Sequence, residues 1–125
     1  MEEDLQQLVA ACSAEHDPRP LARGAFESFC VKHQLERATF FQLFARHVAE
    51  SFAEGSLPFW AGNHAMNALA GDLTEIEGFA LEIFHAFDHG EYLEGSEPPG
   101  TVPWQHYTIP MVMAALANAR YRPLA

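Results

Sequence analysis

The clearest fold signal in this 125-residue chain is the stretch TFFQLFARHVAESF at residues 39–52. Its apolar side chains recur mostly at steps of three or four residues, which is the spacing of one face of an α-helix. These residues are Phe40, Phe41, Phe44, Val48 and Phe52. We therefore expect a helix over about residues 36–54, with Gly55 ending it in a left-handed turn.

The same spacing continues on both sides of this stretch. It predicts helices over about residues 2–15, 20–34, 58–70, 74–89 and 108–121. A break is expected at Asp17-Pro18-Arg19-Pro20, because each proline lacks a backbone donor and restricts the residue before it. Residues 90–107 lack regular apolar spacing and are rich in Pro and Gly. Loops of this length in compact domains are usually functional or mobile.

Local signals refine the last three helices. Thr74-x-x-Glu77 is a capping-box pattern that predicts the start of the fifth helix. Thr108 is expected to cap the last helix. The apolar positions predict burial of Trp60, Met66 and Leu69 in the fourth helix, and of Met113, Leu116, Ala117 and Arg120 along one face of the last. Together these patterns predict one all-α domain over residues 1–125, a bundle of five to six helices with one long loop.

Charge is distributed unevenly along the chain. The sequence has 17 acidic and 7 basic residues, for a formal net charge of −10. Between Arg46 and Arg120 there are ten acidic residues and no Lys or Arg, so this segment carries the whole excess. Nucleic acids and anionic membrane surfaces need basic counter-charge, so both are disfavoured as direct ligands. The charge instead predicts a basic protein or a cation as partner.

The N-terminal sequence and the cysteines indicate a location. The chain has no run of 18 apolar residues, and it starts with the acidic Met-Glu-Glu-Asp where a secretory signal has basic residues. We therefore expect a cytoplasmic protein. Cys12 and Cys30 lack CxxC spacing and are expected to be free and buried, with a disulfide between neighbouring helices as the alternative.

Catalytic and metal-binding patterns are weak. Glu82-x-x-His85 resembles one ligand pair of a di-metal helical bundle, but such bundles need two pairs. A mononuclear site using His85 or His89 with Asp88 is an alternative. The sequence carries no phosphate-binding, dinucleotide-binding, zinc-protease or nucleophile motif. We therefore predict a protein that is not an enzyme and has no cofactor and no metal.

Acidic and aromatic residues over 72–107 form the candidate binding set. Asp72 and Glu75 lie at the start of the fifth helix, where anions stabilise the helix dipole. Asp88 lies near the other end of that helix, where an anion is unfavourable. Acids that destabilise the fold indicate a partner, and exposed Tyr and Trp are typical of binding hot spots. The predicted partner-binding residues are Asp72, Glu75, Asp88, Glu91, Tyr92, Glu94, Glu97 and Trp104.

Two short pieces carry a family resemblance. Met66-Asn-Ala-Leu69 and Ala86-Phe-Asp-His-Gly-Glu-Tyr92 resemble the small acidic helical immunity proteins encoded beside bacterial polymorphic-toxin and contact-dependent or type VI effector genes. The resemblance covers about residues 58–92. It implies a protein that binds and neutralises a cognate toxin, and it assigns no role to any single residue. Many such toxins attack nucleic acids, so a basic toxin domain is the partner that both lines of reasoning predict.

Other interpretations stay open at this stage. A helical adaptor could bind a partner helix through an apolar groove around the third helix, and a small metal-binding domain is a further alternative. Ten Phe and four Met are numerous for a chain of this size, so homodimerisation also stays open.

Overall fold

The structure is a computed structural model that describes residues 1–121. This part of the chain is all-helical and has no strand, so the predicted fold class is confirmed. The six α-helices are α1 (Glu2–Ala14), α2 (Arg19–His33), α3 (Arg37–Ala53), α4 (Phe59–Asn67), α5 (Gly78–His89) and α6 (Ile109–Tyr121). A 3₁₀ turn, η1 (Ala70–Asp72), follows α4, and a π-helical turn, η2 (Trp104–Thr108), leads directly into α6. No helix of the described part is long and apolar enough to cross a bilayer.

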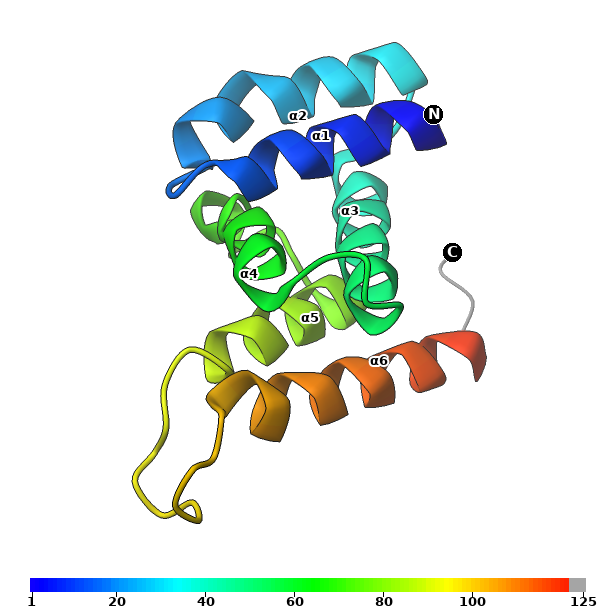
Figure 1. Cartoon of the computed structure of the whole chain (residues 1–125). Coiled ribbons are helices and arrows are strands. Elements are labelled where there is room, and N and C mark those ends of the chain that lie inside the picture. Colours follow the sequence, from blue (N-terminus) through cyan, green and yellow to red (C-terminus); the bar gives the residue numbers. More distant parts are fainter. Residues whose placement is uncertain (122–125) are drawn as a thin grey trace.

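The helices are arranged in three layers (Figure 1). α1 and α2 lie side by side in the first layer, α3 and α4 form the middle layer, and α5 and α6 form the third. The loop over residues 91–102 projects from one end of the third layer. It is shorter than the predicted 90–107 because helical backbone resumes at Pro103.

The stretch that predicted the fold forms the centre of the core. Phe40, Phe41, Phe44 and Val48 of α3 are fully buried. Phe26 of α2 packs against this row, with its ring 4.8 Å from that of Phe40 and 5.4 Å from that of Phe44. The first three helices begin and end within one residue of their predicted limits. Gly55 has a φ of 85°, so the predicted left-handed turn after α3 is confirmed.

The predicted start of α5 is wrong. The helix begins at Gly78 rather than at Thr74, and no side-chain cap bond forms at its N-cap, Glu77. Gln42 of α3 satisfies the backbone here instead: its Nε2 donates to the Glu77 carbonyl at 2.8 Å, and its Oε1 accepts from the Ala80 N–H at 2.9 Å. A contact from another helix therefore replaces the local capping box, and a local pattern could not reveal it.

The buried face of the last helix also differs from the prediction. Val112 and Ala115 are buried, whereas Met113 is 53% exposed and Ala117 is exposed. Leu116 is half-buried, and the side chain of Arg120 lies outside the described residues. Thr108 is fully buried and donates a hydrogen bond to the Ala86 carbonyl at 2.7 Å, so it joins α6 to α5 rather than capping α6. The apolar side chains of this helix lie on all of its faces, so their periodicity alone does not select the buried face.

Gly90 allows the two ends of the projecting loop to lie close together. Its φ of −82° is accessible to any residue, so backbone freedom is not the reason for glycine here. A Cβ at this position would lie 1.9 Å from Thr108 Oγ1 and 3.0 Å from Trp104 Cα. Only glycine allows the end of α5 to approach η2 this closely, and this contact fixes where residues 91–102 leave the helical body.

Candidate binding surface

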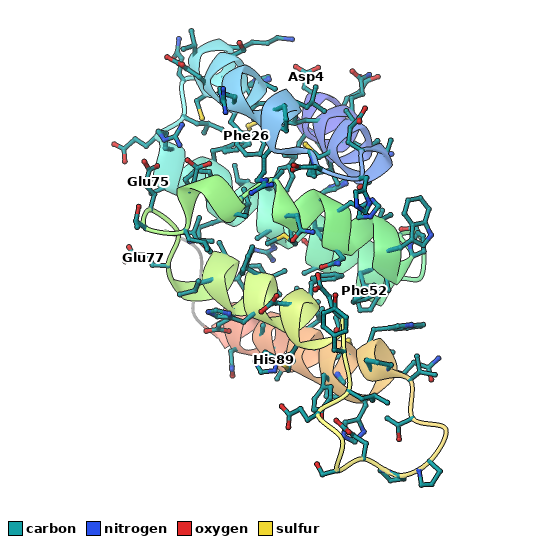
Figure 2. All side chains as sticks on the ribbon, turned by 90° about the vertical axis from the view of Figure 1, so that its left-hand side faces the viewer. Asp4, Phe26, Phe52, Glu75, Glu77 and His89 are labelled. Atoms are coloured by element: carbon teal, nitrogen blue, oxygen red, sulfur yellow. The ribbon has the colours of Figure 1, made fainter. Side chains whose placement is uncertain are left out.

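The predicted binding residues divide between the two ends of α5. Asp72 and Glu75 lie before the helix, and Asp88, Glu91 and Glu94 lie at or beyond its C-terminus. Figure 2 shows Glu75 and Glu77 at one end of α5 and His89 at the other. A helix of 12 residues is about 18 Å long. The structure therefore does not bring the predicted residues together into one site.

At the N-terminal end of α5, the side chains of Asp72 and Glu75 have partners within the fold. The Arg37 guanidinium donates Nη2–H to Asp72 Oδ1 at 2.9 Å and Nε–H to Glu75 Oε2 at 2.8 Å. The hydrogen bond to Glu75 is the main cause that raises the pKa of Arg37. Asp72 and Glu75 are thus accounted for by ion pairs with α3, and not by the interaction with the helix dipole that the sequence predicted.

Beyond the C-terminal end of α5, the Glu97 side chain stabilises the loop through hydrogen bonds to other residues of the loop and of η2. Its carboxylate accepts hydrogen bonds from the Glu94 N–H at 2.7 Å, from the Gly95 N–H at 2.8 Å and from the Tyr107 hydroxyl. The Tyr107 hydroxyl and these backbone donors lower the pKa of Glu97 to about 2. The same contact with the Glu97 carboxylate raises the pKa of Tyr107 to about 12. Glu97 is therefore a structural residue of the loop.

Glu91 and Trp104 also have structural contacts. Glu91 Oε1 accepts a hydrogen bond from Asn63 Nδ2 of α4 at 2.8 Å. The Trp104 ring stacks on Phe59 at 5.9 Å and meets Phe52 edge-on at 6.1 Å. Trp104 thus attaches the end of the loop to the core, while Glu91 fixes its beginning.

Three predicted residues remain unengaged within the described part of the chain. Asp88 and Glu94 are exposed, and neither carboxylate makes a hydrogen bond or ion pair within residues 1–121. Tyr92 is 77% exposed, which is the largest exposed fraction among the large hydrophobic residues. We call Asp88, Tyr92 and Glu94 the loop patch.

A groove of about 360 Å³ lies next to the loop patch, and the sequence analysis did not predict it. It runs between the end of α1, one face of α4 and the start of the loop. Its lining residues are His16, Phe59, Asn63, His64, Asn67, Glu91 and Tyr92. They include one carboxylate and no Lys or Arg, so the groove shares the negative character of the loop patch.

Trp60 extends this surface, against the prediction that it is buried. It is 58% exposed, and its ring meets His64 edge-on at 5.6 Å. His64 in turn meets His16 edge-on at 5.6 Å. The spacing of Trp60, Asn63, His64 and Asn67 places all four on one face of α4. A polar face of this kind, with a Trp on it, is a signal that could have located the groove from the sequence.

The metal alternative finds no support in the geometry of the described residues. Within residues 1–121, no three His, Cys, Asp or Glu side chains lie close enough together to hold a metal ion. His85 is exposed and packs edge-on against Phe84 at 5.9 Å. Cys12 and Cys30 are free and buried, as predicted, and burial raises the pKa of the Cys12 thiol to about 11.

The apolar stripe of α3, on which an adaptor groove would depend, faces the core in the described part of the chain, and all of its residues are buried. Among the side chains that the structure describes, the exposed Trp and Tyr residues lie on α4 and on the loop instead.

Comparison of the chain with models of protein families, with curated proteins and with solved structures found no match. The two pieces Met66-Asn-Ala-Leu69 and Ala86-Phe-Asp-His-Gly-Glu-Tyr92 can be placed in the fold. Met66 and Leu69 are buried next to the groove-forming face of α4, and Phe87 is buried in α5. The second piece ends in Glu91 and Tyr92, which line the groove.

Proposed function

We propose that this protein binds and neutralises a basic bacterial toxin domain through the loop patch and the adjoining groove, acting as an immunity protein in the cytoplasm. The observation that carries the proposal is the set of exposed charges and rings with no role in the fold. Asp88 and Glu94 lack partners within residues 1–121, and the rings of Tyr92 and Trp60 are largely exposed.

Charge supports this partner class. Asp88 lies in the last turn of α5, where the helix dipole makes an anion unfavourable by a few tenths of a kcal/mol or more. A basic partner would offset this cost. An acidic patch repels the phosphates of nucleic acids and attracts the basic cleft of a protein that binds them. Such attraction raises the rate of association and weakens as salt is added.

Exposed aromatic residues supply the second part of the interaction. Tyr and Trp bury large areas at interfaces and are enriched among the residues that contribute most to binding. Tyr92 and Trp60 lie next to the same groove, one on the loop and one on α4. The charges would therefore bring the partner in, and the rings would slow its dissociation.

The test uses the product of the gene next to this one in its genome. Expressed in a bacterial host, the C-terminal domain of that product is expected to arrest growth, and co-expression of this protein is expected to restore it. The variant Asp88→Asn with Glu94→Gln should slow association of the two purified proteins about tenfold at low salt and flatten the salt dependence of the rate.

A matched control is available at the other end of α5. The variant Asp72→Asn with Glu75→Gln removes the same residue types and the same charge, but from acids that pair with Arg37. It should leave the association rate within about twofold of the original. Equal slowing by the two variants, or no complex at all between the two proteins, would contradict the proposal.

A further inference from the structure

The groove beside Tyr92 has the chemistry of a binding site for one cationic side chain. We propose that it takes an arginine side chain of the basic partner, an inference that rests on the proposed function. The volume of about 360 Å³ lies near the lower limit for small-ligand pockets and is too small for a helix. The groove is open to solvent, and Tyr92 of the loop patch is part of its lining.

The acceptor groups in the groove set the charge of the occupant. Glu91 Oε1 is engaged by Asn63 Nδ2, while Oε2 makes no hydrogen bond within the described residues. Because Asn63 donates from Nδ2, its Oδ1 stays available as an acceptor. Asn67 adds a further amide to the lining. A carboxylate with amide oxygens around it favours an occupant that is cationic and carries several donors.

His64 adds one more acceptor, Nε2, because its other ring nitrogen, Nδ1, is used in a hydrogen bond to the backbone. His64 Nδ1 lies 3.2 Å from the Ser13 carbonyl oxygen, which can only accept a hydrogen bond. The proton of the neutral ring is therefore on Nδ1, and Nε2 is left with a lone pair.

The exposed ring of Tyr92 in the lining favours arginine over lysine. Tyr92 is 77% exposed, whereas the ring of Phe59, which also lines the groove, already stacks on Phe87 and Trp104. A guanidinium is planar, stacks on aromatic rings and presents five donors in a fixed fork, so it can satisfy a carboxylate and neighbouring acceptors together. A lysine ammonium is a compact, strongly hydrated charge with three donors, and it gains less from a flat aromatic surface.

The first experiment is an NMR titration of the full chain with N-acetyl-arginine N-methylamide. The probes for comparison are the lysine and citrulline analogues, the latter being neutral and of the same shape as arginine. The side-chain amide signals of Asn63 and Asn67 and the indole N–H of Trp60 report on the groove. We expect saturable shifts of these signals with the arginine probe, and an affinity at least about tenfold weaker for the other two.

Glu91→Gln is the variant that tests the groove. Its amide oxygen can still accept from Asn63, so the groove keeps its shape while it loses its charge. It should weaken binding of the arginine probe about tenfold, whereas the matched control Glu82→Gln, at an exposed acid of α5 outside the groove lining, should leave it unchanged. Equal binding of all three probes, absence of saturable binding, or equal effects of the two variants would overturn the inference.

This outcome is separable from that of the proposed function. If the arginine probe fails but Asp88→Asn with Glu94→Gln still slows toxin association, the groove inference falls and the immunity proposal stands. If the probe binds as expected but no toxin is bound, the immunity proposal falls and the groove remains a site for arginine.

Discussion

The two ends of α5 carry acidic residues in very different surroundings. At the first end, the cleft of about 500 Å³ beside Asp72 is lined by charges of both signs, among them Arg19, Arg23, Arg37 and Asp17. At the other end, the groove beside Tyr92 has one carboxylate and no Lys or Arg in its lining. Acidic residues therefore serve the fold at the N-terminal end of α5, whereas Asp88 and Glu94 at the C-terminal end have no partner within the described residues.

This difference shows that the net charge of a sequence does not say which acidic residues have partners in the folded protein. Arg37 lies 35 residues before Asp72 and 38 before Glu75 in the chain, and only the fold brings it to them. Even at the loop end, Glu97 is used within the molecule, and Glu91 is held at one of its two oxygens. Several of the ten acidic residues between Arg46 and Arg120 are therefore already engaged within the described residues.

Among the changes that test the difference between the two ends of α5, Gly90→Ala is expected to have the largest effect. The added Cβ would lie 1.9 Å from Thr108 Oγ1 and 3.0 Å from a backbone atom of Trp104, so α5 and η2 must separate. We expect the free energy of unfolding to fall by about 2–3 kcal/mol, measured by denaturant titration. The effect should concentrate at the loop end, with the amide spectrum around Arg37 unchanged.

Gly24→Ala is the matched control for this prediction. Gly24 lies in α2 with nothing within 4 Å of the added Cβ, so the change should stabilise the protein by about 0.5–1 kcal/mol. A Gly90→Ala protein as stable as the original would mean that the close approach of Gly90 to Thr108 does not constrain the loop.

Most of the helical framework could be predicted from the sequence. The spacing of Phe40, Phe44 and Val48 defines α3, and the prolines at 18 and 20 separate α1 from α2. These features succeed because they depend on neighbours within one or two turns. The start of α5 could not be predicted, because the partner of its first amides is Gln42 on another helix.

The site was predictable only in part, for the same physical reason. The acids and Tyr92 of the loop patch were identified from charge and composition. The groove depends on α4 lying next to the end of α1 and to Glu91, and those contacts join distant parts of the chain. Trp60 was assigned to the core because it is large and apolar, but its position on the polar face of α4 exposes it.

A smaller effect is expected from pH, through Glu97 and Tyr107. The pKa of Glu97 is lowered from its ordinary 4.5 to about 2, so its stabilisation of the loop is present above pH 4.5 and is lost as the pH falls toward 2. The pKa of Tyr107 is raised from 10.0 to about 12, so its contribution is present below pH 10 and is lost as the pH rises toward 12.

Glu97→Gln tests this link directly. The amide side chain carries no charge, so the pKa of Tyr107 should return toward 10, as measured from the ultraviolet absorbance of tyrosinate with Tyr107→Phe as reference. The backbone signals of Glu94 and Gly95 should also lose their transition in acid. An unchanged pKa of Tyr107 in this variant would show that Glu97 does not hold the loop through the hydroxyl.

The smallest effect is expected from Arg37→Gln, which makes the two ends of α5 more alike in charge. Arg37 is 45% exposed, and exposed ion pairs contribute little, so unfolding should become easier by less than about 1 kcal/mol and the difference should shrink in salt. Asp72 and Glu75 would then attract a basic partner, but the large side chains of α5 at that end, such as Phe79, are buried. The association rate with the toxin domain should therefore rise by no more than about twofold at low salt, and the dissociation rate should stay the same. A large gain in affinity would instead mean that charge alone makes a binding surface in this protein, and that the exposed rings of Tyr92 and Trp60 contribute little.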